Sequence, residues 1–377
     1  MLRLRVWEPP AVDLFELSTE LQASGMRWLA EGGFGLHRRG GAGPSDHKAV
    51  KLDGKLVMVP IHTGSALGSR FEARGGAGET PFLYRDGQPL MPIEIAPVPR
   101  FYKAATAEGV PYWKIATLHA DNVLASTLLQ KCVRYGNQET RCQFCAIGQS
   151  LASGATIVEK SPAQLAEVAK AAVELDGVEH MVLTTGTPKT DDRGAMLLAR
   201  AVAAIRGAVD LPVQAQCEPP VNFSWFQRLH DAGVATLGMH LEAVTEPVRK
   251  RIMPGKAEVP VAVYLEAFVE AVKVFGRGQV TTYILAGLGD SEDDIVVMCE
   301  LLAALGVYPF VVPFVPIAGT RLAHHPPPSA AMMSRLLKRV AGSVARHGLR
   351  SEQIAAGCGR CGACSTLRTA EAEVAHA

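Results

Sequence analysis

An alternation of strands and helices over residues 114–325 constrains the fold of this chain more than any other feature. Six segments in this region have the length and composition of strands, and segments with helical periodicity lie between them. The predicted strands are 115–124, 180–187, 212–218, 236–243, 279–288 and 308–317, and the predicted helices are 161–175, 191–206, 224–232, 260–275, 291–305 and 329–347. Because strands joined through helices run parallel and need helical cover, this order predicts an open doubly wound sheet or a barrel.

Polar residues on two neighbouring strands favour the barrel. Gln216 and Glu218 share one face of the third predicted strand, and His240 and Glu242 share one face of the fourth. Buried parallel strands normally read as continuous apolar runs, so two polar faces indicate an interior lined for a polar ligand near the strands' carboxyl ends. Structural hydrogen bonding across the barrel is the alternative. The predicted fold class is α/β, a partial (β/α)6 TIM-like barrel.

Three zones are predicted along the chain. Residues 1–113 form an N-terminal α+β extension, with an amphipathic helix near 14–29 and strands such as 55–61. Residues 114–325 form the core barrel, and residues 326–377 form a C-terminal helix followed by a Cys-rich tail. Glycine-rich segments in the extension, 37–47 and 64–78, are predicted as loops, since no strand–glycine loop–helix order supports a phosphate site.

Three cysteines follow the first predicted strand. Cys132, Cys142 and Cys145 have the spacing C-x9-C-x2-C. Three thiolates on one loop can hold three irons of a [4Fe–4S] cube and leave the fourth iron without a protein ligand. A structural zinc site would close its shell with a fourth nearby Cys or His, and this loop offers none. The alternative of three unrelated buried thiols fits poorly with the polar residues around them.

A second cysteine cluster lies near the C-terminus. Cys358, Cys361 and Cys364 read C-x2-C-x2-C with glycines between them, which is metal-ligand spacing and too tight for ordinary disulfides. We expect a second iron–sulfur cluster here, with a zinc site completed by His324 or His325 as the alternative. Because the last predicted helix runs antiparallel to the sixth strand, we also expect this tail to close over the mouth of the barrel.

Composition limits the compartment and the partners. The 377 residues are 48% hydrophobic and 20% charged, and the formal net charge is +1, so no global field draws the protein to nucleic acid or to an anionic membrane. Residues 1–8 lack the apolar region of a signal peptide, and the chain has no run of 18 apolar residues. We therefore expect a cytoplasmic protein, in which cysteines serve metals or redox chemistry more often than disulfides. Cys217 and Cys299 lie on apolar faces and are predicted core thiols.

With an open-cluster cysteine loop beside the first of six β/α strands, the chain resembles the radical S-adenosylmethionine (SAM) enzymes over roughly residues 114–325. Residues 184–188 (TTGTP) end the second strand, where that family places a glycine-containing loop that binds the methionine amino group of SAM. The commoner version of that loop carries a carboxylate where Thr187 stands. This departure leaves the role of Thr187 less defined than that of Gly186.

Further segments are similar to biotin and lipoyl synthases. They are residues 240–244 (HLEAV), 249–255 (RKRIMPG), 286–290 (AGLGD) and 317–322 (IAGTRL). The cysteine spacing differs from the C-x3-C-x2-C of those enzymes. The nine-residue gap instead resembles the spacing in elongator-type and some uncharacterised radical SAM proteins. Among these, we predict that the chain is most similar to the uncharacterised radical SAM proteins of bacterial nitrilase gene clusters.

The resemblance implies a [4Fe–4S] cluster on Cys132, Cys142 and Cys145, with SAM chelating the unique iron. An electron from flavodoxin or ferredoxin cleaves SAM, and the 5′-deoxyadenosyl radical abstracts hydrogen from substrate. Phe144 would shield the cluster, and Glu242 would bind ribose hydroxyls. Arg251, or else Arg249, would pair with the methionine carboxylate unless these residues belong to a solvated face. The full set of implied cofactor-binding residues is Phe144, Gly186, Thr187, Gln216, Glu218, His240, Glu242, Arg251, Gly287 and Leu288.

The preferred function is a radical SAM enzyme acting on a small molecule. The alternative within the family is modification of tRNA or a peptide, including sulfur insertion from the second cluster. Near-neutral charge and the lack of a basic appended domain weigh against RNA. A non-catalytic iron–sulfur or zinc protein would need only the cysteines, so it leaves the polar strand faces unexplained.

Overall fold

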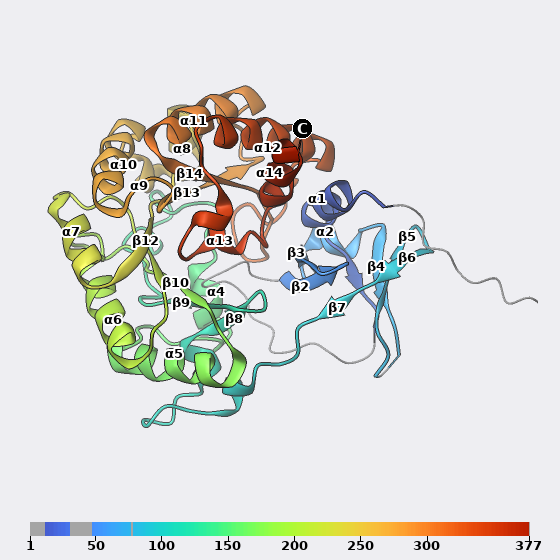
Figure 1. Ribbon diagram of the computed structural model, residues 1–377, viewed down its shortest axis with the longest axis horizontal. Coiled ribbons are helices and arrows are strands. Elements are labelled where there is room, and N and C mark those ends of the chain that lie inside the picture. The colour runs from blue at the N-terminus through green and yellow to red at the C-terminus, as the bar shows by residue number, and fades with distance from the viewer. Residues whose placement is uncertain (1–11, 31–46, 77, 377) are drawn as a thin grey trace, which may run out of the picture.

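The computed structural model describes residues 12–30, 47–76 and 78–376. A curled sheet with helices on its outside forms the larger part of the molecule (Figure 1), which confirms the predicted α/β partial barrel. Within the described residues this sheet has seven strands in the order β14-β13-β12-β11-β10-β9-β8. Their bounds are β8 (Thr117–His119), β9 (Val123–Thr127), β10 (His180–Thr184), β11 (Val213–Gln216), β12 (Val234–Gly238), β13 (Val280–Ala286) and β14 (Val307–Pro313).

Strands β9 to β14 are parallel, whereas β8 pairs antiparallel with β9. The predicted single strand 115–124 is therefore wrong, because this segment turns back on itself. Ala120 has a φ of 63°, and Asp121 and Asn122 after it are residues that favour turns. The first parallel strand thus begins later than predicted, and β8 forms the last strand of the sheet.

The predicted helices all occur and cover the outer face of the sheet (Figure 1). Ser161 and Ser291 start two of them with capping boxes that pair with Gln164 and Asp294. Among the described residues no helix is long and apolar enough to cross a membrane. The long helices are α5 (Pro162–Asp176), α6 (Ala195–Ala208), α7 (Ser224–Asp231), α10 (Val261–Phe275), α11 (Glu292–Leu305) and α12 (Ala330–Arg346).

Shorter helices lie in the loops and in the tail. They are α3 (Tyr112–Ile115), α4 (Ile147–Ala152), α8 (Glu246–Ile252), α9 (Pro254–Ala257), α13 (Cys358–Cys361) and α14 (Leu367–His376), with 3-10 turns at Arg100–Lys103 and Ser351–Gln353. The main core lies between the sheet and the long helices. Three of its aromatic side chains, Phe226, Phe268 and Phe310, are at most 1% exposed. Burial of each such side chain contributes about 1.5–3 kcal/mol of hydrophobic free energy.

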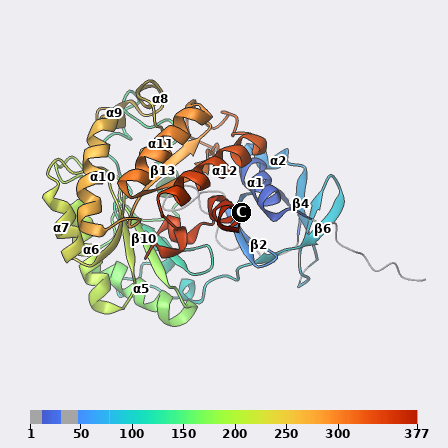
Figure 2. The same cartoon turned by 45° about the horizontal axis from the view of Figure 1, so that its top comes forward.

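The N-terminal extension has its own small core and stands beside the barrel (Figures 1 and 2). In its described part the strands form two sheets, of order β1-β4-β5-β6 and β3-β2-β7. The predicted strand 55–61 is confirmed as β3, which forms a hairpin with β2 through Asp53 and Gly54, both at positive φ. The elements are α1 (Leu14–Ser24), β1 (Arg27–Trp28), β2 (His47–Leu52), β3 (Lys55–Pro60), α2 (Gly64–Leu67), β4 (Phe71–Arg74), β5 (Phe82–Arg85), β6 (Gln88–Pro92) and β7 (Glu94–Ile95).

Three predictions for the extension need comment. The predicted loop 64–78 is wrong over part of its length, because it contains helix α2 (Gly64–Leu67), which Thr63 caps, and strand β4 (Phe71–Arg74), which pairs with β5. The predicted helix 14–29 ends at Ser24 in α1, because Gly25 at φ 70° stops it. The predicted loop 37–47 lies outside the described residues except for His47, which begins β2.

The C-terminal tail enters the barrel at the amino ends of the strands. The amide of Gly357 donates to Nδ1 of His180, the first residue of β10, at 3.1 Å. Thr236, near the start of β12, donates through its hydroxyl to the carbonyl of Ala356 at 3.0 Å. The prediction that this tail closes the mouth at the carboxyl ends is therefore wrong. Helix α12 begins beyond the carboxyl end of β14, so its antiparallel course carries the chain to the opposite end.

The tail also joins the extension to the barrel. The carbonyl of Ala363 accepts hydrogen bonds from the amide of Met58 in β3 at 2.8 Å and from Nε2 of Gln22 in α1 at 2.9 Å. Thr19 and Thr366 share a buried hydroxyl contact of 2.7 Å. Three segments far apart in the sequence thus meet at the amino ends of the strands.

Asp290 should contribute strongly to stability because its carboxylate holds the β12–α8 loop. It accepts hydrogen bonds from the amides of Val244 at 2.8 Å and Thr245 at 3.1 Å, and the side chain of Asp290 is buried. Asp290→Ala leaves these amides without a hydrogen-bond acceptor. We therefore expect urea unfolding to show that the free energy of unfolding falls by about 1–3 kcal/mol. Asp293→Ala, which removes only an exposed ion pair with Arg339, should cost at most about 1 kcal/mol. Equal losses in the two variants would contradict this account.

Candidate functional site

The cysteine loop opens into a cavity at the carboxyl ends of the strands. This carboxyl-end cavity has a volume of about 360 Å³, and Cys132, Cys142 and Cys145 all line it together with Phe144. Burial raises the pKa of Cys145 to about 11 and raises that of Cys142 well above its ordinary value. Metal binding requires the thiolate form and would release these protons, and three sulfur donors on one loop fit an iron–sulfur cluster.

In residues 12–30, 47–76 and 78–376, no group of three or more His, Cys, Asp or Glu side chains is arranged so that it could hold a metal ion. A [4Fe–4S] cube attaches its ligands to separate irons.

Glycine is required where the β10–α6 loop meets the cysteine loop. A Cβ on Gly186 would lie 2.1 Å from the carbonyl oxygen of Lys131, so a larger residue would push the two loops apart. Next to it, the carbonyl of Thr187 accepts a hydrogen bond from the amide of Val133 at 2.8 Å. Gly186 and Thr187 therefore lie directly beside the cysteine loop, and both line the carboxyl-end cavity.

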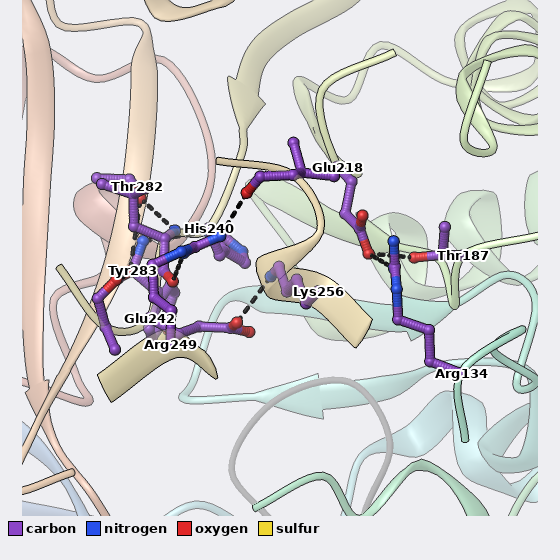
Figure 3. A network of polar contacts seen from close by, with 12 residues as sticks. Arg134, Thr187, Glu218, His240, Glu242, Arg249, Lys256, Thr282 and Tyr283 are labelled. Atoms are coloured by element: carbon purple, nitrogen blue, oxygen red, sulfur yellow. Dashed lines mark hydrogen bonds and ion pairs between the residues drawn. The ribbon is translucent and has the colours of Figure 1, made fainter. Parts of the chain in front are cut away.

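Glu218 is the centre of a buried ionic network (Figure 3). Its carboxylate accepts hydrogen bonds from the hydroxyl of Thr187 at 2.7 Å, from Arg193 at 2.9 Å and from Arg134 of the cysteine loop. Burial alone would raise the pKa of Glu218, but the charges of Lys256 and Arg134 and the hydroxyl of Thr187 lower it below its ordinary value. The carboxylate thus stays ionised and holds the cysteine loop against the barrel.

Glu242 forms a second ion pair in the same cavity. Its Oε2 lies 2.7 Å from Nζ of Lys256, and both residues line the cavity wall (Figure 3). Burial alone would lower the pKa of Lys256, but the carboxylates of Glu242 and Glu218 raise it, so the ammonium group stays charged. Glu242 has a φ of 64°, which costs a non-glycine residue about 1–2 kcal/mol. Hydrogen bonds of its backbone to Tyr283 and Leu285 hold this conformation.

His240 is a neutral hydrogen-bond donor in the barrel interior. Its Nδ1 accepts a hydrogen bond from the amide of Tyr283 at 3.1 Å, and the two rings meet edge to face at 4.8 Å. Burial, followed by the charge of Lys256, lowers the pKa of His240 to about 3. A neutral imidazole that accepts at Nδ1 carries its proton on Nε2, so His240 can donate at that atom.

A second cavity occupies the centre of the barrel. This central cavity has a volume of about 320 Å³ and shares several lining residues with the carboxyl-end cavity. The shared residues are Phe144, Thr184, Gln216, His240, Glu242 and Ile317. Cys358 and Cys364 line this central cavity, whereas Cys132, Cys142 and Cys145 line the carboxyl-end cavity.

Gln216 contacts the tail rather than the cysteine loop. Its Nε2 lies 2.8 Å from Oε1 of Gln214 and 3.5 Å from Sγ of Cys358, while Gln214 also accepts from the amide of Cys358 at 3.2 Å. The polar side chains of β11 and of the residues just after it thus have two roles. Glu218 lines the carboxyl-end cavity, and Gln214 and Gln216 contact Cys358 of the C-terminal cysteine cluster.

Three other predicted residues lie outside the lining of both cavities. Nη2 of Arg251 donates to the carbonyl of Leu288 at 3.0 Å, and Gly287 packs against Pro328. Their roles toward SAM stay predictions. The neighbouring Arg249 is completely buried, and its guanidinium donates to the carbonyls of Leu241 and Val259. In this structure Arg249 serves as a structural residue.

Sequence reasoning missed several residues of the site. Lys256 directly follows the segment 249–255, and Arg134 lies between the first two cysteines. A carboxylate inside a barrel needs a cation as its partner, and this rule could have pointed to both residues. His119 and Tyr283, which line the central cavity, carried no pattern of their own.

Comparison with known proteins gives a family. A family model described as the Radical SAM superfamily matches residues 139–302, a range that contains Cys142 and Cys145 and begins after Cys132. The bacteriochlorophyllide c C-7(1)-hydroxylase of Chlorobaculum limnaeum is 28% identical over 224 residues, which cover 54% of this chain and 56% of that protein. The probable dual-specificity RNA methyltransferase RlmN of Moorella thermoacetica is 29% identical over 139 residues, which cover 37% of this chain and 38% of that protein.

This chain therefore spans about half the length, or less, of these curated relatives. Among solved structures, methylornithine synthase (PylB) matches with a TM-score of 0.48 at 13% identity over 72% of this chain and 77% of that chain. HydG, a maturase of the [FeFe]-hydrogenase, matches with a TM-score of 0.47 at 15% identity over 59% of this chain and 49% of that chain. From the match over residues 139–302 we conclude that this chain contains a radical SAM domain, and the two curated relatives that it resembles are enzymes.

Proposed function

We propose that this enzyme binds a [4Fe–4S] cluster through Cys132, Cys142 and Cys145, binds SAM beside it, and abstracts hydrogen from a small molecule. The observation that carries the proposal is the carboxyl-end cavity, which the three cysteines share with Gly186 and Glu242 in a chain with a radical SAM domain. When bound and reduced, the cluster would supply the electron that cleaves SAM into methionine and a 5′-deoxyadenosyl radical.

The residues of the cavity would hold SAM and keep the cysteine loop in place. Glu242 is ready to accept two ribose hydroxyls, because Lys256 compensates its charge without using both carboxylate oxygens. Glu218 and Thr187 would fix the loop that carries the cysteines, and Gly186 would leave its backbone accessible. His240 would donate from Nε2 into the space that both cavities share.

The central cavity supports a small substrate. About 320 Å³ is at the lower end of the volumes that small-molecule sites occupy. Its wall combines apolar side chains, among them Met58, Val182 and Phe314, with few polar groups. A folded tRNA does not fit into such a space, and hydrogen abstraction would take place where this cavity meets Phe144 and Glu242.

We further propose that Cys358, Cys361 and Cys364 hold a second iron–sulfur cluster. Cys358 and Cys364 line the central cavity, so a cluster there would lie next to the substrate and opposite the first cluster. Burial raises the pKa of Cys361 to about 12 and raises those of Cys358 and Cys364, as it does for Cys142 and Cys145. A flavodoxin or ferredoxin in a reducing cytoplasm would be the electron donor.

Replacement of Cys132 by Ala should abolish SAM cleavage while the barrel stays folded. The variant loses one of three cluster ligands, so we expect no 5′-deoxyadenosine above background after anaerobic reconstitution and reduction with dithionite. Cys299→Ala is the matched control, since Cys299 is fully buried in α11 and lines neither cavity. Full 5′-deoxyadenosine formation by the Cys132 variant would refute the proposed cluster.

Replacement of Glu242 by Gln should weaken SAM binding by about 1–3 kcal/mol, the scale of a hydrogen bond to a charged group. The measurement is SAM affinity by equilibrium binding to the reconstituted enzyme. Glu258→Gln is the control, because Glu258 is exposed and lies just beyond Lys256. An unchanged SAM affinity in the Glu242 variant would remove this residue from the ribose site.

Iron content should reveal the second cluster. Reconstituted wild-type enzyme should hold about eight irons per chain, and a variant with Ala at positions 358, 361 and 364 about four, on the basis of four irons per cube. Iron and zinc are both measured by elemental analysis. About four irons in both proteins, with zinc in the wild type alone, would contradict a second cube and support a structural zinc site.

A further inference from the structure

We propose that His119 is the fourth protein ligand of the metal site formed by Cys358, Cys361 and Cys364. This inference rests on the second cluster proposed above. Three cysteines leave one iron of a cube without a protein ligand. His119 lies 245 residues away in the sequence, yet its Nε2 is 3.6 Å from Sγ of Cys364.

The β8–β9 hairpin brings His119 to the tail. His119 is the last residue of β8 and is paired with Val123 at the start of β9. The tail enters the barrel at this same end, so the hairpin and the cysteines meet there. Ala120 and Val123 pack with Ala363 in one small apolar cluster, which Cys358, Cys361 and Cys364 adjoin. This contact places the imidazole beside the thiols.

Several other cysteine and histidine side chains lie or form hydrogen bonds elsewhere. Cys217 lines the carboxyl-end cavity, and Cys299 is fully buried in α11. His325, considered as a zinc ligand from sequence, contacts the carbonyl of Gly287 at 2.9 Å through Nε2. His180 lies close to the tail, but its Nδ1 already accepts the amide proton of Gly357, so its Nε2 carries a proton and has no lone pair for a metal.

Nε2 is the nitrogen through which His119 would bind the metal. A neutral imidazole binds iron through one nitrogen and keeps its proton on the other. Nε2 faces Cys364, so Nδ1 would keep the proton in the bound form.

Two other polar side chains near these thiols suit a different role. Nε2 of Gln216 lies 3.5 Å from Sγ of Cys358, and an amide nitrogen donates hydrogen bonds but does not bind iron. The hydroxyl of Tyr283 forms hydrogen bonds with Cys358 and Cys364, and burial raises the pKa of Tyr283 well above its ordinary value. The phenol therefore stays protonated and acts as a donor to the sulfurs.

Histidine ligation has a chemical consequence for the cluster. A neutral imidazole in place of a thiolate makes the cluster less negative, and exchange of Cys for His is known to raise the reduction potential of iron–sulfur centres. With four protein ligands, this cluster would have no open iron for the substrate. Such a cluster would instead relay electrons to or from the substrate in the central cavity.

The test uses full-length enzyme with Ala at positions 132, 142 and 145, so that only the C-terminal site holds iron. After anaerobic reconstitution and reduction, pulsed electron paramagnetic resonance should detect a strongly coupled nitrogen. Growth on ¹⁵N-histidine should convert its signal from ¹⁴N to ¹⁵N, a result that requires no substitution at His119. His119→Cys should keep about four irons, lose the nitrogen coupling and lower the midpoint potential.

His180→Asn is the matched control, because Asn can still accept the amide proton of Gly357, and this variant should keep the nitrogen coupling. Tyr283→Phe should keep it as well. About four irons without a histidine nitrogen coupling would overturn the proposal and leave His119 as a hydrogen-bond partner of Cys364, with the second cluster intact. Absence of iron in the starting variant would instead overturn the second cluster and, with it, the role of His119.

Discussion

Two carboxylates at neighbouring strand ends, one buried and one partly buried, are the constraint on which the rest of the site depends. Glu218 and Glu242 follow β11 and β12 inside the barrel, and a buried carboxylate without a cation costs several kcal/mol. The cations come from other segments. Arg134 belongs to the cysteine loop, and Lys256 belongs to α9. Neutralising the two charges therefore also fixes the cysteine loop and α9 against the barrel, and these contacts form the wall of the carboxyl-end cavity.

The barrel interior is closed from its other end by the tail and the extension. Residues of the tail contact the starts of β10 and β12, and Ala363 accepts hydrogen bonds from Met58 and Gln22 of the extension. Both segments also supply wall residues of the central cavity. The extension thus forms part of the proposed substrate site. A chamber with a cysteine cluster at each end suits radical chemistry, since reactive intermediates need protection from water.

Much of the fold and part of the site were predictable from sequence. Strand and helix periodicity gave the α/β barrel. The predicted strands 212–218 and 236–243 gave the inward side of Glu218 and Glu242, although both residues lie just beyond the observed ends of β11 and β12. Local patterns failed where the chain reverses over a few residues. The hairpin at Ala120 was predicted as one strand, and the tail was assigned to the wrong end of the barrel. The cation partners were missed because each lies far in sequence from its carboxylate.

The sequence by itself determined the order of elements, the two cysteine clusters and the polar faces of two strands, because these depend on spacing within a short segment. Only the tertiary structure decided which end of the barrel each cysteine cluster occupies and which charges pair. It also brought His119 to Cys364 across 245 residues. Such contacts depend on how helices return the chain and on where buried charges find partners, and neither leaves a periodic signal in the sequence.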